Sequence, residues 1–205
     1  MAGRFPKAFF LVRSLLASAL FLCLHGTSSA LADEPAAPYE LPKQFSVVQT
    51  IQNGAQTAVQ HLYRDGDKLR LESQEGAATQ IIIVRKDQKK VYTVLPADKR
   101  VTEITYQETA PSAQIGPGEP GASWTFQQKE TLRGHACAKY FMKGSRKSAY
   151  VWVDEAGKYP VRIAAADGTN VADWDQYQAA PQPPALFEPP ADYQKTTIEL
   201  PKGPW

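Results

Sequence analysis

The sequence is short of the residues that catalytic and metal sites most often use. Its 205 residues include two cysteines and three histidines, and beyond residue 32 only Cys137, His61 and His135 remain. One cysteine in residues 33–205 excludes an internal disulfide there. A zinc site needs three or four ligands at suitable spacing, and His135 with Cys137 is the single suggestive pair. We therefore expect no metal site and no cofactor.

The sequence also lacks a large excess of positive or negative charge. The formal net charge is +2, but residues 1–32 carry three basic residues and no acidic one; the remaining 173 residues carry 20 basic and 21 acidic residues, a net charge of −1. A near-neutral protein has no long-range field with which to gather nucleic acid or to coat an anionic membrane. With 43% apolar and 10% aromatic residues, the chain is also unlike a disordered one.

Long hydrophobic runs are absent except near the N-terminus. There, three basic residues precede an apolar run of about a dozen residues, 14–24, and the small-residue site Ala30-Leu31-Ala32. This is the layout of a secretory signal peptide, and the run is shorter than the ~20 residues that a spanning helix needs. We predict a signal peptide over residues 1–32, export of the protein, and no stable membrane insertion after the signal is removed.

The rest of the chain is rich in short β-type runs separated by turn residues. Residues 68–72 alternate between apolar and charged side chains, a period of two that only a strand produces. Residues 80–84 are apolar on both faces, which favours a central strand, and Asn53-Gly54 is a strong hairpin signal. Eleven strands are expected, at 45–51, 58–63, 68–72, 80–84, 91–95, 101–106, 124–129, 137–143, 148–153, 160–164 and 171–177.

This pattern, without a three-turn amphipathic helix, predicts a mainly β protein. We expect one domain over residues 44–193: a curved, incompletely closed antiparallel sheet, a half-barrel meander of about eleven strands. A flexible proline-rich leader (33–43) precedes it and a C-terminal tail (194–205) follows it. The longest interruption, 107–123, is a loop that is a candidate gate.

No catalytic constellation is evident. Cys137 beside His135 suggests a dyad, but nothing singles out a third member, and a packed free cysteine is the favoured interpretation. Asp173 and Asp175 share a strand face and suggest acid–base chemistry, yet a polar strand face near the chain end is more often solvated. We predict that the protein is not an enzyme.

Large aromatic residues gather on strands in the second half of the chain. By parity Trp124 and Phe126 share a face, and so do Tyr150 and Trp152. With no long helix to cover such a face, two alternatives stay open: a core filled by the chain's own side chains, or an apolar pocket in an open curved sheet. For the second alternative these four residues are the predicted ligand-binding residues.

The order and spacing of several motifs resemble the outer-membrane-lipoprotein carrier (LolA/LolB-like) superfamily, in particular its small periplasmic members. The resemblance covers about Phe45–Tyr193. The segments that carry it are Leu62–Leu71, Ile81–Asp87, Lys90–Pro96, Lys99–Glu103, Glu130–Tyr140, Trp152–Arg162 and Leu186–Tyr193.

The resemblance implies a periplasmic protein whose sheet has short helical turns or a loop over its concave face. Its relatives hold acyl chains, lipids or peptides in the cell envelope, and others sense envelope stress. We therefore expect a non-catalytic carrier for a lipid or acyl chain, with an envelope interaction or stress-sensing protein as the alternative. The chain departs from the carrier in having the leader 33–43 instead of a long helix. Arg70, the nearest counterpart of the carrier's lid-holding arginine, points outward.

Overall fold

The computed structural model describes residues 37–75, 78–105, 121–145 and 147–199, all of which belong to the unit Asp33–Trp205. The predicted signal peptide over residues 1–32 lies outside these residues. So does the loop predicted at 107–123, except for its last three residues.

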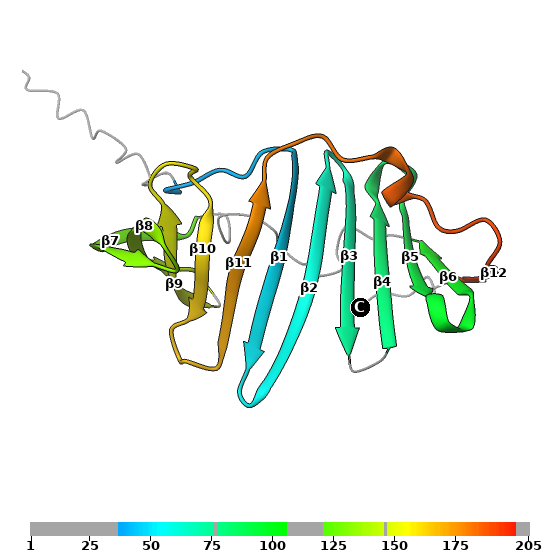
Figure 1. Cartoon of the computed structure of the whole chain (residues 1–205), viewed down its shortest axis with the longest axis horizontal. Helices are drawn as coiled ribbons and strands as arrows, with labels where there is room; N and C mark the ends of the chain where they lie inside the picture. The colour runs from blue at the N-terminus through cyan, green and yellow to red at the C-terminus, as the bar shows by residue number, and fades with distance from the viewer. Residues whose placement is uncertain (1–36, 76–77, 106–120, 146, 200–205) are drawn as a thin grey trace, which may run out of the picture. The chain divides into compact units, whose positions relative to one another are not determined.

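In the described residues, twelve strands form one sheet in the order β12-β6-β5-β4-β3-β2-β1-β11-β10-β9-β8-β7 (Figure 1). Strands β1 to β6 pair in chain order, as do β7 to β11, and the antiparallel pairing of β1 with β11 joins the two groups. The strands are β1 (Gln44–Asn53), β2 (Gln56–Asp65), β3 (Lys68–Glu75), β4 (Ala78–Arg85), β5 (Lys90–Leu95), β6 (Arg100–Thr105), β7 (Ser123–Leu132), β8 (His135–Lys143), β9 (Ser148–Asp154), β10 (Pro160–Ala165), β11 (Asn170–Gln178) and β12 (Gln194–Ile198).

The predicted mainly β meander is confirmed, and the sheet is not closed into a barrel. All eleven expected strands are present. The twelfth, β12, lies in the segment predicted as a C-terminal tail and pairs parallel with β6. Parallel pairing needs a long connection, so no hairpin signal in the sequence marks it.

Helical structure among the described residues is limited to three 3-10 turns: η1 (Lys86–Gln88), η2 (Pro96–Asp98) and η3 (Pro184–Phe187). Within that part of the chain, no helix has the length and apolar character needed to cross a bilayer. The sheet therefore has to be covered by irregular segments.

Two irregular segments cover opposite faces of the sheet. Tyr39 and Leu41, both buried, pack with Phe45, Val47 and Trp174. We call this side of the sheet the leader face. Its cluster of buried residues is Tyr39, Leu41, Phe45, Val47, Leu62, Ala122, Met142, Ala149, Val151, Val153 and Trp174.

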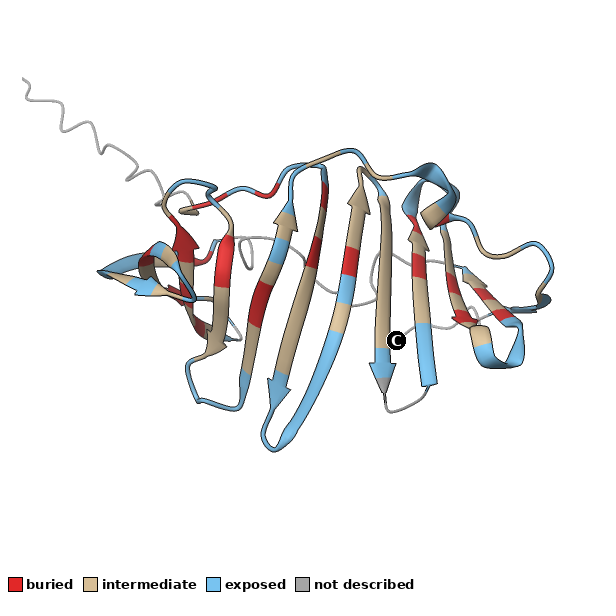
Figure 2. Ribbon diagram, in the orientation of Figure 1, coloured by how far each residue is buried: buried red, intermediate tan, exposed pale blue. Residues whose placement is uncertain are grey.

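The other side, the tail face, is covered by η3 and the residues that follow it. Phe187 is fully buried there against Ile83, Tyr92, Val94 and Val101. Ile82 and Ile83 are neighbours on β4 and point to opposite faces. This agrees with the prediction, made from the run of apolar residues at 80–84, that the strand is central. Figure 2 shows the resulting bands of buried residues, with the β1–β2 hairpin end exposed.

The described part of the segment predicted as a flexible leader, residues 37–43, packs against the sheet. Tyr39 is 4% exposed and Leu41 is 8% exposed, and the Tyr39 ring meets Trp124 of β7 edge-on with 6.0 Å between ring centroids. Three prolines suppress secondary structure but do not prevent apolar side chains from docking on an uncovered sheet face.

Candidate functional site

The leader face carries three rows of side chains that cross several strands. Partners in an antiparallel ladder lie directly opposite each other and point to the same side, so the register fixes each row. The first row is Phe45, Arg64, Leu69, Val84, Val91 and Ile104; the second is Val47, Leu62, Leu71, Ile82, Thr93 and Thr102; the third is Gln49, Gln60, Ser73 and Gln80.

The first two rows extend an apolar surface beyond the covered part of the leader face. Phe45, Val47 and Leu62 are buried in the leader-face cluster. Further along, the side chains are only half-buried, and those on β4 to β6 belong to neither cluster of the described residues. We call this surface the apolar stripe; it comprises Leu69, Leu71, Ile82, Val84, Val91 and Ile104.

The third row is polar, and three of its four members are linked by hydrogen bonds. Gln60 Nε2 donates to Gln49 Oε1 at 3.0 Å, and Ser73 Oγ donates to Gln60 Oε1 at 3.3 Å. Trp174 lies opposite Gln49 in the ladder, and its buried Nε1 has no hydrogen-bond partner among the described residues. The leader face therefore has an apolar region bordered by a neutral, hydrogen-bonding row.

The four predicted ligand-binding residues divide between the two faces. Trp124 and Phe126 lie opposite Met142 and Tyr140 on the leader face, and Phe126 is 52% exposed. Tyr150 and Trp152 point to the tail face, where Lys139 Nζ lies 4.9 and 4.6 Å from their ring centroids. Parity along one strand identified each pair, but only the register between strands shows that the pairs point apart.

The tail-face aromatic pair has a polar partner of its own. Trp152 Nε1 donates a hydrogen bond of 2.6 Å to Glu130 Oε1, which holds the pKa of that carboxyl below its ordinary value. Phe141 lies beside Tyr150 at 5.2 Å between centroids. The half-buried rings of Tyr150 and Trp152 are therefore held by cation–π contacts with Lys139, and Trp152 is also held by its hydrogen bond.

The suggested Cys137–His135 dyad is not assembled as a nucleophile with its base. Cys137 is 1% exposed, and its thiol contacts the backbone carbonyl of His135 at 3.5 Å. Burial raises the pKa of the thiol, which disfavours the reactive thiolate. The His135 ring is held by Asp154 at 3.1 Å. Among the described residues no group of three or more side chains could hold a metal ion.

Asp173 and Asp175 are paired with arginines. Arg162 binds Asp173 through two contacts of 2.6 and 2.8 Å, and Arg133 binds Asp175 through contacts of 2.7 and 2.8 Å. The expectation that both are solvated is wrong for Asp173, which is 5% exposed. These ion pairs join β10 and the β7–β8 hairpin to β11.

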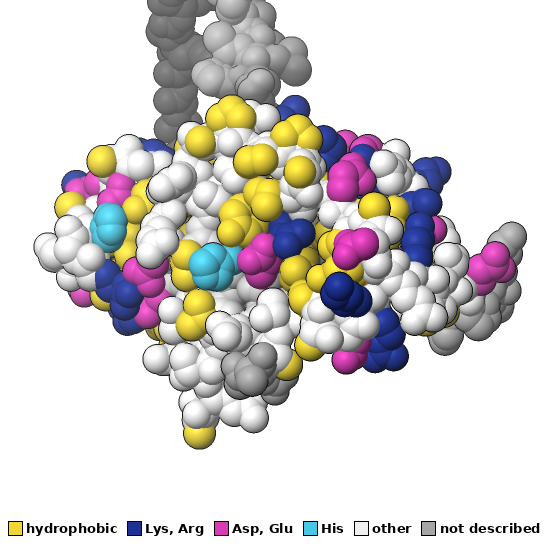
Figure 3. Space-filling view, turned by 45° about the vertical axis from the view of Figure 1, so that its right-hand side comes forward, with side chains coloured by type: hydrophobic (Ala, Val, Ile, Leu, Met, Phe, Trp, Pro, Cys, Tyr) yellow, Lys and Arg dark blue, Asp and Glu magenta, His cyan; other side chains and the backbone are white. Residues whose placement is uncertain are grey.

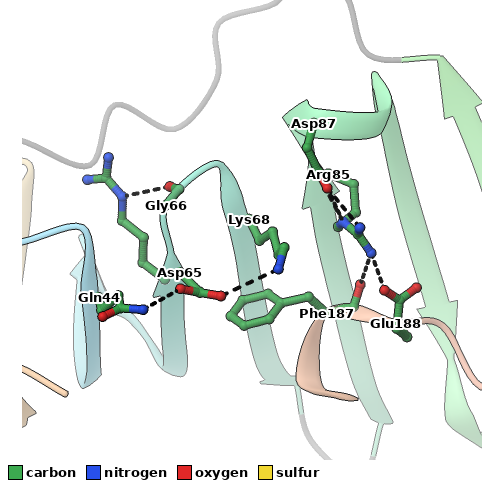
Figure 4. A network of polar contacts seen from close by, with 9 residues as sticks. Gln44, Asp65, Gly66, Lys68, Arg85, Asp87, Phe187 and Glu188 are labelled. Carbon is green, nitrogen blue, oxygen red and sulfur yellow. Dashed lines mark hydrogen bonds and ion pairs between the residues drawn. The ribbon is translucent and has the colours of Figure 1, made fainter. Parts of the chain in front are cut away.

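On the tail face, Arg70 and Arg85 hold the segment after β11; Figure 4 shows the contacts of Arg85. Arg85 binds Asp87 at 2.8 Å and also contacts Glu188 and the carbonyl of Phe187. The sequence predicted that Arg70 points outward. Instead, Arg70 lies on the tail face, donates to the carbonyl of Leu186 at 2.8 Å, and has a side chain that is only 14% exposed. Positive and negative side chains lie next to one another over much of the surface seen in Figure 3.

The sequence matches no family model and no curated protein. Its fold is similar to that of an uncharacterized conserved protein from Thermus thermophilus, with a TM-score of 0.56 at 10% identity over 76% of this chain and 91% of that one. It is also similar to MucB, with a TM-score of 0.52 at 12% identity over 77% of this chain and 61% of MucB, so the chain spans about three fifths of MucB.

An outer-membrane lipoprotein-sorting protein domain from Vibrio parahaemolyticus aligns with a TM-score of 0.36 at 13% identity, over 71% of this chain and 90% of that one. MucB has the LolA-like fold, so the predicted resemblance to the lipoprotein-carrier superfamily is confirmed at the level of fold. MucB has also been solved in complex with MucA from Pseudomonas aeruginosa.

Proposed function

We propose that this protein is a non-catalytic periplasmic carrier that binds a lipid or acyl chain on the leader face. The observation that supports this best is the apolar stripe, whose β4–β6 members are half-buried and lie outside both clusters of the described residues. A contiguous apolar surface on an exported protein is typical of a binding site. The predicted signal peptide supports the periplasmic location.

Burial of the ligand's hydrocarbon chain is the driving force of the proposed binding. Each methylene removed from water contributes about 0.8 kcal/mol. A sixteen-carbon chain would therefore gain on the order of 10 kcal/mol before the costs of association. Trp124 and Phe126 lie on the same face but on β7, at the opposite end of the strand order from the apolar stripe, so they are not proposed to contact a ligand bound there. Tyr150 and Trp152 lie on the tail face and have no role in the proposed binding.

The first test is native mass spectrometry of the full chain purified from its own periplasm, followed by titration with a fluorescent fatty acid. We expect co-purified lipid, or uptake of the probe in a one-to-one complex. Ile82→Asp places a charge in the apolar stripe and should abolish uptake. Thr79→Asp is the matched control, since it puts the same charge on the exposed tail face of β4. Absence of lipid together with absence of uptake contradicts the proposal.

A second candidate is an envelope interaction protein that binds a partner through the sheet. It is favoured by β7, an edge strand that pairs only with β8 among the described residues and exposes most of its side chains. An exposed edge can accept a further strand, and MucB has a protein partner. Recovery of a stoichiometric protein from envelope extracts with lipid-free protein would favour this candidate over the carrier.

A further inference from the structure

The two faces of the sheet differ in where their carboxylates lie, whereas basic side chains occur on both. Every carboxylate on a strand, among those whose side chains are described, points to the tail face. These residues are Asp65, Glu72, Glu103, Glu130, Asp154, Asp173 and Asp175, as the register shows. Among the strand residues whose side chains are described, none places a negative charge on the leader face.

Arg64 is the exception among the described arginines. It lies in the first row of the leader face, directly between Phe45 of β1 and Leu69 of β3. Its one hydrogen bond runs from Nε to the carbonyl of Gly66 at 3.4 Å, which is long. The other described arginines each bind a carboxylate: Arg70 with Glu72, Arg85 with Asp87, Arg100 with Asp98, Arg133 with Asp175 and Arg162 with Asp173.

An unpaired guanidinium beside buried apolar side chains is unfavourable, because partial burial removes water without supplying a counter-charge. Phe45 is fully buried and Arg64 itself is half-buried. The guanidinium has its two terminal nitrogens available, the geometry that binds a carboxylate or phosphate through two parallel hydrogen bonds. An anion bound here would give Arg64 the negatively charged partner that every other described arginine already has.

We propose that the ligand is an anionic long-chain amphiphile whose carboxylate or phosphate binds Arg64, while its chain lies along the first row over Leu69, Val84, Val91 and Ile104. From Arg64 on β2 to Ile104 on β6 there are four steps between strands of about 4.8 Å each, roughly 19 Å, enough for an extended long-chain acyl group. This inference rests on the proposed carrier function and adds the charge of the ligand to it.

The test compares different head groups on the same acyl chain, using the exported protein. Binding of palmitate, its methyl ester and a single-chain lysophosphatidic acid is measured by displacement of a neutral fluorescent acyl probe. We expect both anions to bind at least about tenfold more tightly than the ester, the range for hydrogen bonds to charged groups. Tighter binding of palmitate assigns a carboxylate head group, and tighter binding of the lysophospholipid assigns a phosphate.

Variants separate the head-group contact from the chain contact. Arg64→Gln should reduce the affinity for the anions to that for the ester and leave the ester unchanged; Arg64→Lys, which keeps the charge but not the fork, should lie between. Arg100→Gln is the matched control, because Arg100 is on the same face but is exposed and bound to Asp98. Thermal unfolding confirms that each variant is folded.

Three outcomes overturn the inference. If the wild type binds the acid and the ester with equal affinity, or if Arg64→Gln weakens the binding of both equally, Arg64 does not bind the head group. The carrier function would then still stand. Failure of the wild type to bind any of the three ligands or the probe removes the carrier function and this inference with it.

Discussion

The two faces of the sheet are covered in different ways, and the difference separates stability from binding. On the tail face, Phe187 is fully buried, and Arg70 and Arg85 bond to the carbonyls of η3, so the chain seals its own apolar surface. On the leader face, Tyr39 and Leu41 cover one part and the apolar stripe continues past them. A sheet of this kind can therefore use one face for folding and keep part of the other for a ligand.

The largest expected effect comes from removing the tail-face anchor. Phe187→Ala should lower the free energy of unfolding by about 3–4 kcal/mol, because a buried ring is lost and the cavity cannot fully collapse. The measurement is urea unfolding of the full chain. Phe126→Ala on the leader face is the control; since Phe126 is 52% exposed, its loss should cost less than about 1 kcal/mol. Similar losses in both variants would refute the assignment of the core.

Substitutions at two neighbouring residues of β4 test the same difference between the two faces. Ile83→Ala should cost about 2–4 kcal/mol of stability and leave fatty-acid binding unchanged, because Ile83 is fully buried on the tail face. Ile82→Ala should cost only about 1 kcal/mol and weaken fatty-acid binding roughly fivefold, in proportion to the lost hydrocarbon contact. Unfolding curves and ligand titrations on the same samples test both, and the reverse pattern would show that the binding face is wrongly assigned.

The smallest effect concerns pH and the β6–β12 pair. Lys195 and Lys90 both bind Glu103, and the hydrogen bond from Lys195 is the main cause of a pKa below the ordinary 4.5. A carboxyl with a lowered folded-state pKa adds stability that is complete above 4.5 and is lost as pH falls below it. As the pH is lowered from about 6 to 3, the thermal unfolding midpoint of Glu103→Gln should therefore fall less steeply than that of the wild type.

The control for that experiment is Glu199→Gln, which removes an exposed carboxylate just after β12. Its profile should follow that of the wild type. If Glu103→Gln also follows the wild type, the ion pairs of Glu103 do not contribute to the stability of this edge of the sheet.

Local patterns allowed most of the strands to be predicted. Alternation in residues 68–72, the doubly apolar run around Ile82 and Ile83, and glycine turns such as Gly66, whose φ of +60° suits a hairpin, are encoded within a few residues of each other. These features need no knowledge of distant contacts.

The candidate site was harder to predict because it depends on pairing between distant strands. Aromatic parity identified Trp124 with Phe126 and Tyr150 with Trp152, but their opposite directions follow from the β8–β9 and β7–β8 registers. Arg64 gave no signal in the sequence, where it is one of several arginines; its lack of a carboxylate partner is visible only once the faces are known.

By itself, the sequence determined the class of the fold, the positions of eleven strands and the turns between them, because a period of two and the backbone preferences of turn residues act over short distances. The tertiary structure alone decided that β1 joins β11, that residues 37–43 and 184–187 cover opposite faces, and that the carboxylates gather on one of them. A one-residue shift in register moves every side chain of a strand to the other face, and no local pattern determines that register for strands more than a hundred residues apart.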